Sequence, residues 1–285
     1  MSSDERLSYR RRKIGQALRR YREERNLTQE AAGRLVERSP ASLSAYENGH
    51  RAIRPRDLRQ ILDHYGVGDE GERARLLELA VQGRKEGWWR DFHLSQEPVI
   101  VDVASLEEDA SRIRSLETMA IPGLLQTESY TRAVFSSYSD VRDTKRDKDA
   151  LAFRMARQRI LKSPSPPQVT WILAEAVAHM LVGGAEVMKE QFRKILMGAN
   201  AGRFELRVLP FSAGAHPGMD GSFSIIDVGT EDPMKVVCVH SLTRSWLIDE
   251  PPRIDRYEWA YEELSSLALS KTDSQILLKE IASTL

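Results

Sequence analysis

Six side chains in the second half of the chain belong to residue types that often catalyse reactions or bind metals. They are Glu175, His179, His216, Asp220, Cys238 and His240. None stands in a recognised catalytic or metal-binding pattern, because the sequence contains no G-x-S-x-G, H-E-x-x-H, Walker or C-x-x-C motif. The single cysteine also excludes an intramolecular disulfide and any site built from several thiolates. We therefore expect a protein that is not an enzyme, with no catalytic residue, metal site or cofactor.

A different kind of chemistry is indicated by residues 39–49, SPASLSAYENG, and the basic stretch that follows them. Ser39 is a favoured N-cap, Pro40 suits the first helical position and Gly49 suits the turn after the last one. Leu43 and Tyr46 are the only large apolar residues, so this short helix has one narrow buried side. Its other side carries small side chains beside several arginines.

Four further helices are predicted around this segment. Apolar spacing indicates helices at 14–25, at 29–38 behind a Thr28 N-cap, at 55–66 and at 70–82. We expect Leu18, Leu35, Leu43 and Tyr46 in the core, whereas the charge run of residues 10–13 is expected to be a solvated arm. Five short helices make a compact all-α domain, which we assign to residues 1–82.

The charge of the chain is unevenly distributed, although the formal net charge is zero. Residues 1–85 carry 19 Lys and Arg against 13 Asp and Glu, which leaves 23 against 29 for residues 86–285. A basic first part suggests contact with nucleic acid, and the acidic remainder suggests another role.

Residues 13–80 resemble the helix-turn-helix domain of Cro/repressor or Xre-class regulators. The resemblance rests on LRRYREERNLTQEAAGRLVERSPASLSAYENG, followed by an R-P pair and a helix ending in YGV. It implies binding to double-stranded DNA. Two positions depart from the family pattern: Gly33 stands where alanine is usual, and Glu37 stands where glycine is common.

The resemblance implies a role for individual residues in this domain. The positions that correspond to the groove-facing side of the recognition helix are Pro40, Ala41, Ser42 and Ala45. None is a long bidentate donor, so we expect thymine-methyl contacts, one hydroxyl contact and modest base discrimination. Contacts to phosphates would come from Gln29, Asn48, Arg51, Arg54 and Arg56, with entry into a narrow minor groove as an alternative for Arg54. Arg22 and Glu47 are implied to form a structural pair.

The remainder of the chain is predicted to be an α+β domain at residues 105–285, after a linker at 83–104 that Trp88 and Trp89 anchor. Residues 105–118 have the pattern of an amphipathic helix capped by Ser105. Short β-branched runs at QVTWILAE, ELRVLP, SFSIIDV and KVVCVH predict strands, and spacing predicts helices at 186–198, 254–269 and 273–284. The overall fold class is thus a five-helix repressor-type domain followed by a larger α+β domain.

The second half also resembles a known domain. The segments IPGLLQTESYTRAVF, FRMARQRIL, ILAEAVAHMLVGGAEVMKEQFRKIL and LRVLPFSAGAHPGMDGSFSIIDV are similar to the C-terminal domain of actinobacterial Xre-type regulators of the Streptomyces developmental kind. The resemblance covers residues 85–285 and implies an antitoxin-like pairing with a small protein. His240 departs from it, because an acidic residue is expected there.

The sequence is compatible with two roles for the second half. A protein partner would need exposed apolar surface, for which IPGLLQ at 121–126 is a candidate. A small-molecule sensor would need an apolar pocket, for which Trp171, Phe223, Trp246 and Tyr257 are available. The sequence has no signal-peptide pattern and no run long enough to cross a bilayer, so we expect a cytoplasmic homodimer.

Overall fold

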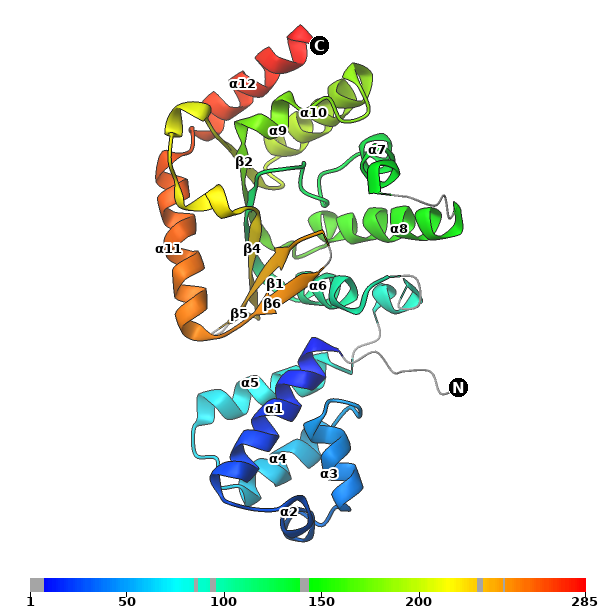
Figure 1. Cartoon of the computed structure of the whole chain (residues 1–285), viewed down its shortest axis with the longest axis vertical. Helices are drawn as coiled ribbons and strands as arrows, with labels where there is room; N and C mark the ends of the chain where they lie inside the picture. The colour runs from blue at the N-terminus through cyan, green and yellow to red at the C-terminus, as the bar shows by residue number, and fades with distance from the viewer. Residues whose placement is uncertain (1–7, 85–86, 93–95, 139–143, 230–232, 243) are drawn as a thin grey trace. The chain divides into compact units, whose positions relative to one another are not determined.

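The structure is a computed structural model, and it describes residues 8–84, 87–92, 96–138, 144–229, 233–242 and 244–285. The chain forms two compact units (Figure 1): one comprises residues 1–93 with 97–102, and the other residues 94–96 with 103–285. No helix in the described ranges is long and apolar enough to cross a membrane.

The first unit contains the five predicted helices. They are α1 (Tyr9–Glu24), α2 (Gln29–Leu35), α3 (Pro40–Glu47), α4 (Pro55–His64) and α5 (Glu70–Gln82). The hydroxyl of Thr28 accepts from the backbone N–H of Ala31 at 3.1 Å, and that of Ser39 accepts from Ser42 at 3.2 Å. Gly49 has a φ of 73°, which only glycine adopts without strain. The predicted caps of α2 and α3 are therefore confirmed.

Two expectations about this unit were wrong. The basic run at residues 10–13 is part of α1, because the Ser8 hydroxyl accepts from the Arg11 N–H and starts the helix earlier; Arg10 is buried. Leu35 is 41% exposed, whereas Val36, the next residue, is buried. Helix α2 ends at Leu35 and the chain turns there, so the side chain of Val36 enters the core in place of Leu35.

The second unit is built on one six-stranded mixed sheet, which confirms the α+β prediction. Its strands are β1 (Ala110–Glu117), β2 (Gln168–Ala174), β3 (Glu205–Leu209), β4 (Phe223–Val228), β5 (Met234–His240) and β6 (Ser245–Ile248), in the order β3-β2-β1-β4-β5-β6. Strands β1, β2 and β3 are parallel, and β4, β5 and β6 continue the sheet in antiparallel fashion.

Helices cover both faces of this sheet. They are the part of α6 (Pro98–Glu108) that follows residue 102, α7 (Glu128–Tyr138), α8 (Thr144–Arg157), α9 (Glu175–His179), α10 (Ala185–Asn200), α11 (Pro251–Leu267) and α12 (Lys271–Thr284). Figure 1 shows α11 along one face, with α7 and α8 on the other. The α11 side is a packed core that includes Leu116, Ile225, Val237, Tyr261 and Leu264.

The predicted helix at 105–118 is wrong, because α6 ends at Glu108 and residues 110–117 form the central strand β1. The Ser105 cap signal and the amphipathic pattern had indicated a helix here. In the structure the guanidinium of Arg114 is buried and donates to Asp227 at 3.2 Å and to Glu258 at 2.8 Å. A charged residue is tolerated in a buried strand when it is paired in this way.

Candidate nucleic-acid interface

Helix α3 has one buried side and one side of small residues. Leu43, Tyr46 and Glu47 are buried. The four predicted base-contacting positions lie away from these three: Pro40 and Ala41 are exposed, and Ser42 and Ala45 are half-buried. The outer side of α3 therefore offers no bulky side chain that would hold its backbone away from another surface.

The position of α3 depends on a close contact with α1 that the sequence reasoning missed. A Cβ atom added at Gly15 would lie 2.4 Å from the carbonyl oxygen of Glu47 and 2.5 Å from that of Tyr46. Only glycine allows this backbone-to-backbone approach. A lone glycine inside the apolar spacing of a helix was the available signal.

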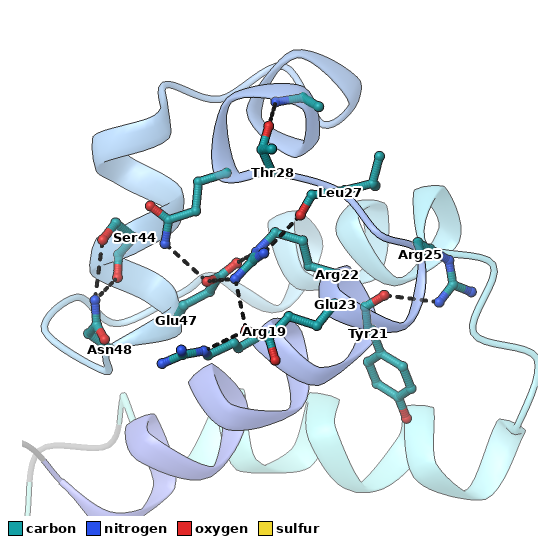
Figure 2. Close-up of polar contacts among 12 residues, drawn as sticks. Arg19, Tyr21, Arg22, Glu23, Arg25, Leu27, Thr28, Ser44, Glu47 and Asn48 are labelled. Carbon is teal, nitrogen blue, oxygen red and sulfur yellow. Dashed lines mark hydrogen bonds and ion pairs between the residues drawn. The ribbon is translucent and has the colours of Figure 1, made fainter.

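A buried polar cluster joins α1, α2 and α3 behind this surface (Figure 2). The carboxylate of Glu47 accepts from Arg22 Nε at 2.6 Å and Nη2 at 2.9 Å, and its side chain is only 1% exposed. Arg22 Nη1 also donates to the carbonyl of Leu27 at 2.8 Å, so all three guanidinium nitrogens of Arg22 donate hydrogen bonds. Gln29 adds a third donor to Glu47 at 3.1 Å. These contacts fix the start of α2 and the end of α3 relative to each other.

Two of the residues assigned to phosphates already have partners within the domain. One amide hydrogen of Gln29 is donated to Glu47, which leaves the other for an outside acceptor. The Asn48 amide donates to the carbonyl of Ser44 at 2.9 Å and to its hydroxyl at 3.2 Å. Asn48 would have to release one of these bonds to reach a phosphate.

The three assigned arginines lie exposed after α3 and at the start of α4. Within the described residues, Arg51 and Arg54 form no ion pair, and Arg56 lies 3.8 Å from Asp57 while its side chain is 83% exposed. In contrast to these three, the exposed Arg19 of α1 and Arg34 of α2 each pair with an acid one turn away, Glu23 and Glu30 respectively. Uncompensated positive charge is thus placed beside the outer side of α3.

The turn between α2 and α3 accounts for Gly33 and shows that Glu37 is strained. Glu37 has a φ of 54°, a left-handed conformation that glycine adopts more easily. A Cβ added at Gly33 would lie 2.6 Å from the carbonyl oxygen of Arg38. The turn is also tied to α4 by a 3.2 Å bond from Arg38 to Asp57, which the sequence did not reveal.

Replacing Glu37 by glycine should raise the free energy of unfolding of this unit by about 1 kcal/mol, because it removes the left-handed strain. Glu37→Ala is the matched control, since it removes the same charge and keeps the Cβ. Gly33→Ala should lower the free energy of unfolding despite the better helix propensity of alanine. Urea denaturation followed by circular dichroism measures all three, and equal effects of the glycine and alanine variants at position 37 would contradict the strain.

Two models of known families match the chain. Residues 13–76 match the model of a helix-turn-helix domain, and residues 100–280 match that of a domain of unknown function (DUF5753). No curated protein and no solved structure matches the chain. Because the second match covers more than half of the sequence, the chain belongs to the DUF5753 family, and it carries a helix-turn-helix domain ahead of that domain.

Proposed function

We propose that this protein is a sequence-specific, DNA-binding transcription regulator of the Cro/repressor (Xre) class. The observation that carries the proposal is the small-residue side of α3, bordered by Arg51 and Arg54 without acidic partners in the described residues. A helix fits the major groove of B-DNA, and small side chains let its backbone approach the base edges. The arginines would neutralise phosphates on either side of the groove.

Base reading in this proposal is mainly apolar. Pro40, Ala41 and Ala45 would contact thymine methyl groups. The Ser39 hydroxyl donates to that of Ser42 at 2.9 Å, so Ser42 keeps its own proton for a base or a phosphate. Such contacts discriminate modestly, and a cytoplasmic homodimer on two half-sites about one helical turn apart would supply the missing specificity.

Fluorescence anisotropy tests the proposal directly. The full chain is titrated against a duplex from upstream of its own gene and against a scrambled duplex of the same composition. The proposal predicts a preference of about 10³-fold for the first duplex at physiological salt. Equal and weak binding to both duplexes would contradict sequence-specific recognition by this chain alone.

Replacing Arg54 by alanine should weaken binding to both duplexes by a similar factor of about tenfold, because a phosphate contact carries no sequence information. The slope of log K against log salt should become shallower by about 0.9. Arg34→Ala is the matched control, since Arg34 is exposed and already paired with Glu30 at 3.2 Å. An unchanged slope for Arg54→Ala would place the phosphate contact elsewhere.

For the second unit, we propose a regulatory role. The resemblance to actinobacterial antitoxin-like regulators favours a small protein partner. The prediction that residues 121–126 expose apolar surface to that partner is wrong, however. Ile121, Leu124 and Leu125 are buried, with 4% exposure or less. Gln126 anchors the same segment by donating to the Ile121 carbonyl at 2.8 Å. Co-purification of this chain with the product of a neighbouring small gene would test whether it binds such a partner.

The aromatic residues assigned to a sensor pocket divide into three groups. Phe223 and Tyr257 pack into the core under α11, and Trp246 is 40% exposed. Trp171 alone lines a cavity, on the opposite face of the sheet. This cavity supports a ligand-binding role for the second unit.

A further inference from the structure

The sheet of the second unit has a row of small side chains where bulky ones would normally fill a core. Ser115 of β1 pairs in register with Ser224 of β4, which pairs with Cys238 of β5. Residues in register point to the same face of a sheet. The two serine hydroxyls bond to each other at 2.8 Å. Three short side chains in one row leave a hollow above the centre of the sheet.

This hollow is the floor of a cavity of about 250 Å³. Its walls come from five places: Glu107 on α6, Trp171 on β2, Phe135 on α7, Arg154 on α8 and the loop at residues 120–124. The loop is held by Gln158, which donates to the carbonyls of Gly123 at 3.0 Å and Gln126 at 2.8 Å. The volume corresponds to roughly eight water molecules or a small organic molecule.

Most charged groups that line the cavity already have partners. Arg157 donates to both carboxylate oxygens of Glu107, at 3.0 and 2.7 Å. Arg154 donates to Gln126 at 2.8 Å, and its guanidinium lies 5.1 Å from the centre of the Phe135 ring. Both ring nitrogens of His240 are also engaged, one with Cys238 at 3.3 Å and the other with Ser245 at 2.7 Å.

Glu117 is different from these groups. Its carboxylate lines the cavity at the end of β1 and has no hydrogen-bond or ion-pair partner in the described part of the chain. Glu117 is half-buried, and a carboxylate that loses part of its hydration without gaining donors is in an unfavourable position. A ligand that brings hydrogen-bond donors and positive charge would provide that compensation.

We propose that this cavity binds a small organic amine, whose ammonium group pairs with Glu117 and whose carbon skeleton packs against Trp171 and Phe135. An ammonium offers three donors and a full charge, and aromatic walls suit an apolar skeleton. The site lies wholly within residues 103–285 and goes beyond the proposed DNA binding. It does not rest on that function, so either proposal can fail without the other.

The ionisation of Glu117 should make binding of an amine depend on pH. Burial raises the pKa of Glu117 to about 8, and the positive charges of Arg154 and Arg157 offset only part of that rise. Glu107, Cys238 and His240 also line the cavity, and burial raises the pKa of the Cys238 thiol to about 12. An ammonium ligand favours the ionised carboxylate, so binding near neutral pH should release a proton, and affinity should rise from pH ~6.5 to ~8.5.

The test uses isothermal titration of the full chain with three probes that share one skeleton: 2-phenylethylamine, 2-phenylethanol and phenylacetate. The proposal predicts binding of the amine, weaker binding of the alcohol and none of the acid. Titration in buffers of different ionisation enthalpy should reveal the released proton. Preference for phenylacetate would assign recognition to the arginines and overturn the proposal, as would the absence of binding by all three at millimolar concentration.

Two variants make the assignment specific. Glu117→Gln keeps the shape of the side chain, and it should lower affinity for the amine at least tenfold and abolish the pH dependence, while binding of the alcohol changes little. Ser224→Leu should fill the floor and abolish binding of both probes, with circular dichroism to confirm the fold. Equal affinity of the parent and Glu117→Gln for 2-phenylethylamine would overturn the proposal. DNA binding, measured separately by anisotropy, reports on the other unit.

Discussion

Replacing Glu47 by alanine is expected to lower the free energy of unfolding of the helix-turn-helix domain by about 3–5 kcal/mol, because it leaves the Arg22 guanidinium buried without its carboxylate. The pair joins α1 to α3 through bonds of 2.6 and 2.9 Å. Gln29 loses its acceptor in the same change. A loss of this size is comparable to the whole stability of many small domains. We therefore also expect Glu47→Ala to lose DNA binding, although Glu47 would not contact DNA.

Glu30→Ala is the matched control for this prediction. Glu30 pairs with Arg34 one turn away, at 3.2 Å, but both side chains are more than 70% exposed. Exposed pairs of this kind contribute about 0.3–0.5 kcal/mol. Urea denaturation of the two variants, followed by circular dichroism, compares them. Similar losses for Glu30→Ala and Glu47→Ala would mean that the buried cluster does not hold α3 in place.

Replacing Ala41 by glutamate should reduce affinity for DNA by about 100-fold or more, since like charges brought together at an interface cost several kcal/mol. Ala41 is exposed on α3, so the domain should remain folded. A glutamate there would face the phosphates and acceptor atoms of the major groove. Anisotropy with the duplex from upstream of the gene measures the loss.

Ala74→Glu is the control for charge alone, because Ala74 is also exposed but lies on α5. It adds the same negative charge to the same domain, and it should weaken binding only slightly through the long-range field. If Ala41→Glu bound DNA like the parent, or if the two variants lost equal affinity, α3 would not be the helix that enters the groove.

The first unit was largely predictable from the sequence, because its helices are delimited by local signals. Ser39, Thr28 and Gly49 mark helix ends through hydrogen bonds and dihedral angles within a few residues of themselves. Gly15 was a local signal of a close contact, but its partners, the carbonyls of α3, were not predictable because they lie more than 30 positions away.

The fold and the cavity of the second unit were less predictable, because they depend on contacts between distant segments. The segment of β1 was predicted to be helical from its local pattern, because the partners of Arg114 on β4 and α11 lie far along the chain and gave no local signal. The hollow over Ser115, Ser224 and Cys238 exists only once three strands are in register. Nothing local to Glu117 indicates that it lines a cavity, because the walls come from other segments.

The central claim is that DNA binds the outer side of α3 and the arginines that follow it. Amide chemical-shift mapping of the isotope-labelled full chain, during titration with the duplex from upstream of its gene, tests this claim most directly. We predict shifts at residues 28–29 and 39–56, with α5 (Glu70–Gln82) unaffected. Shifts concentrated on α5 or in the second unit, with α3 unchanged, would contradict the account.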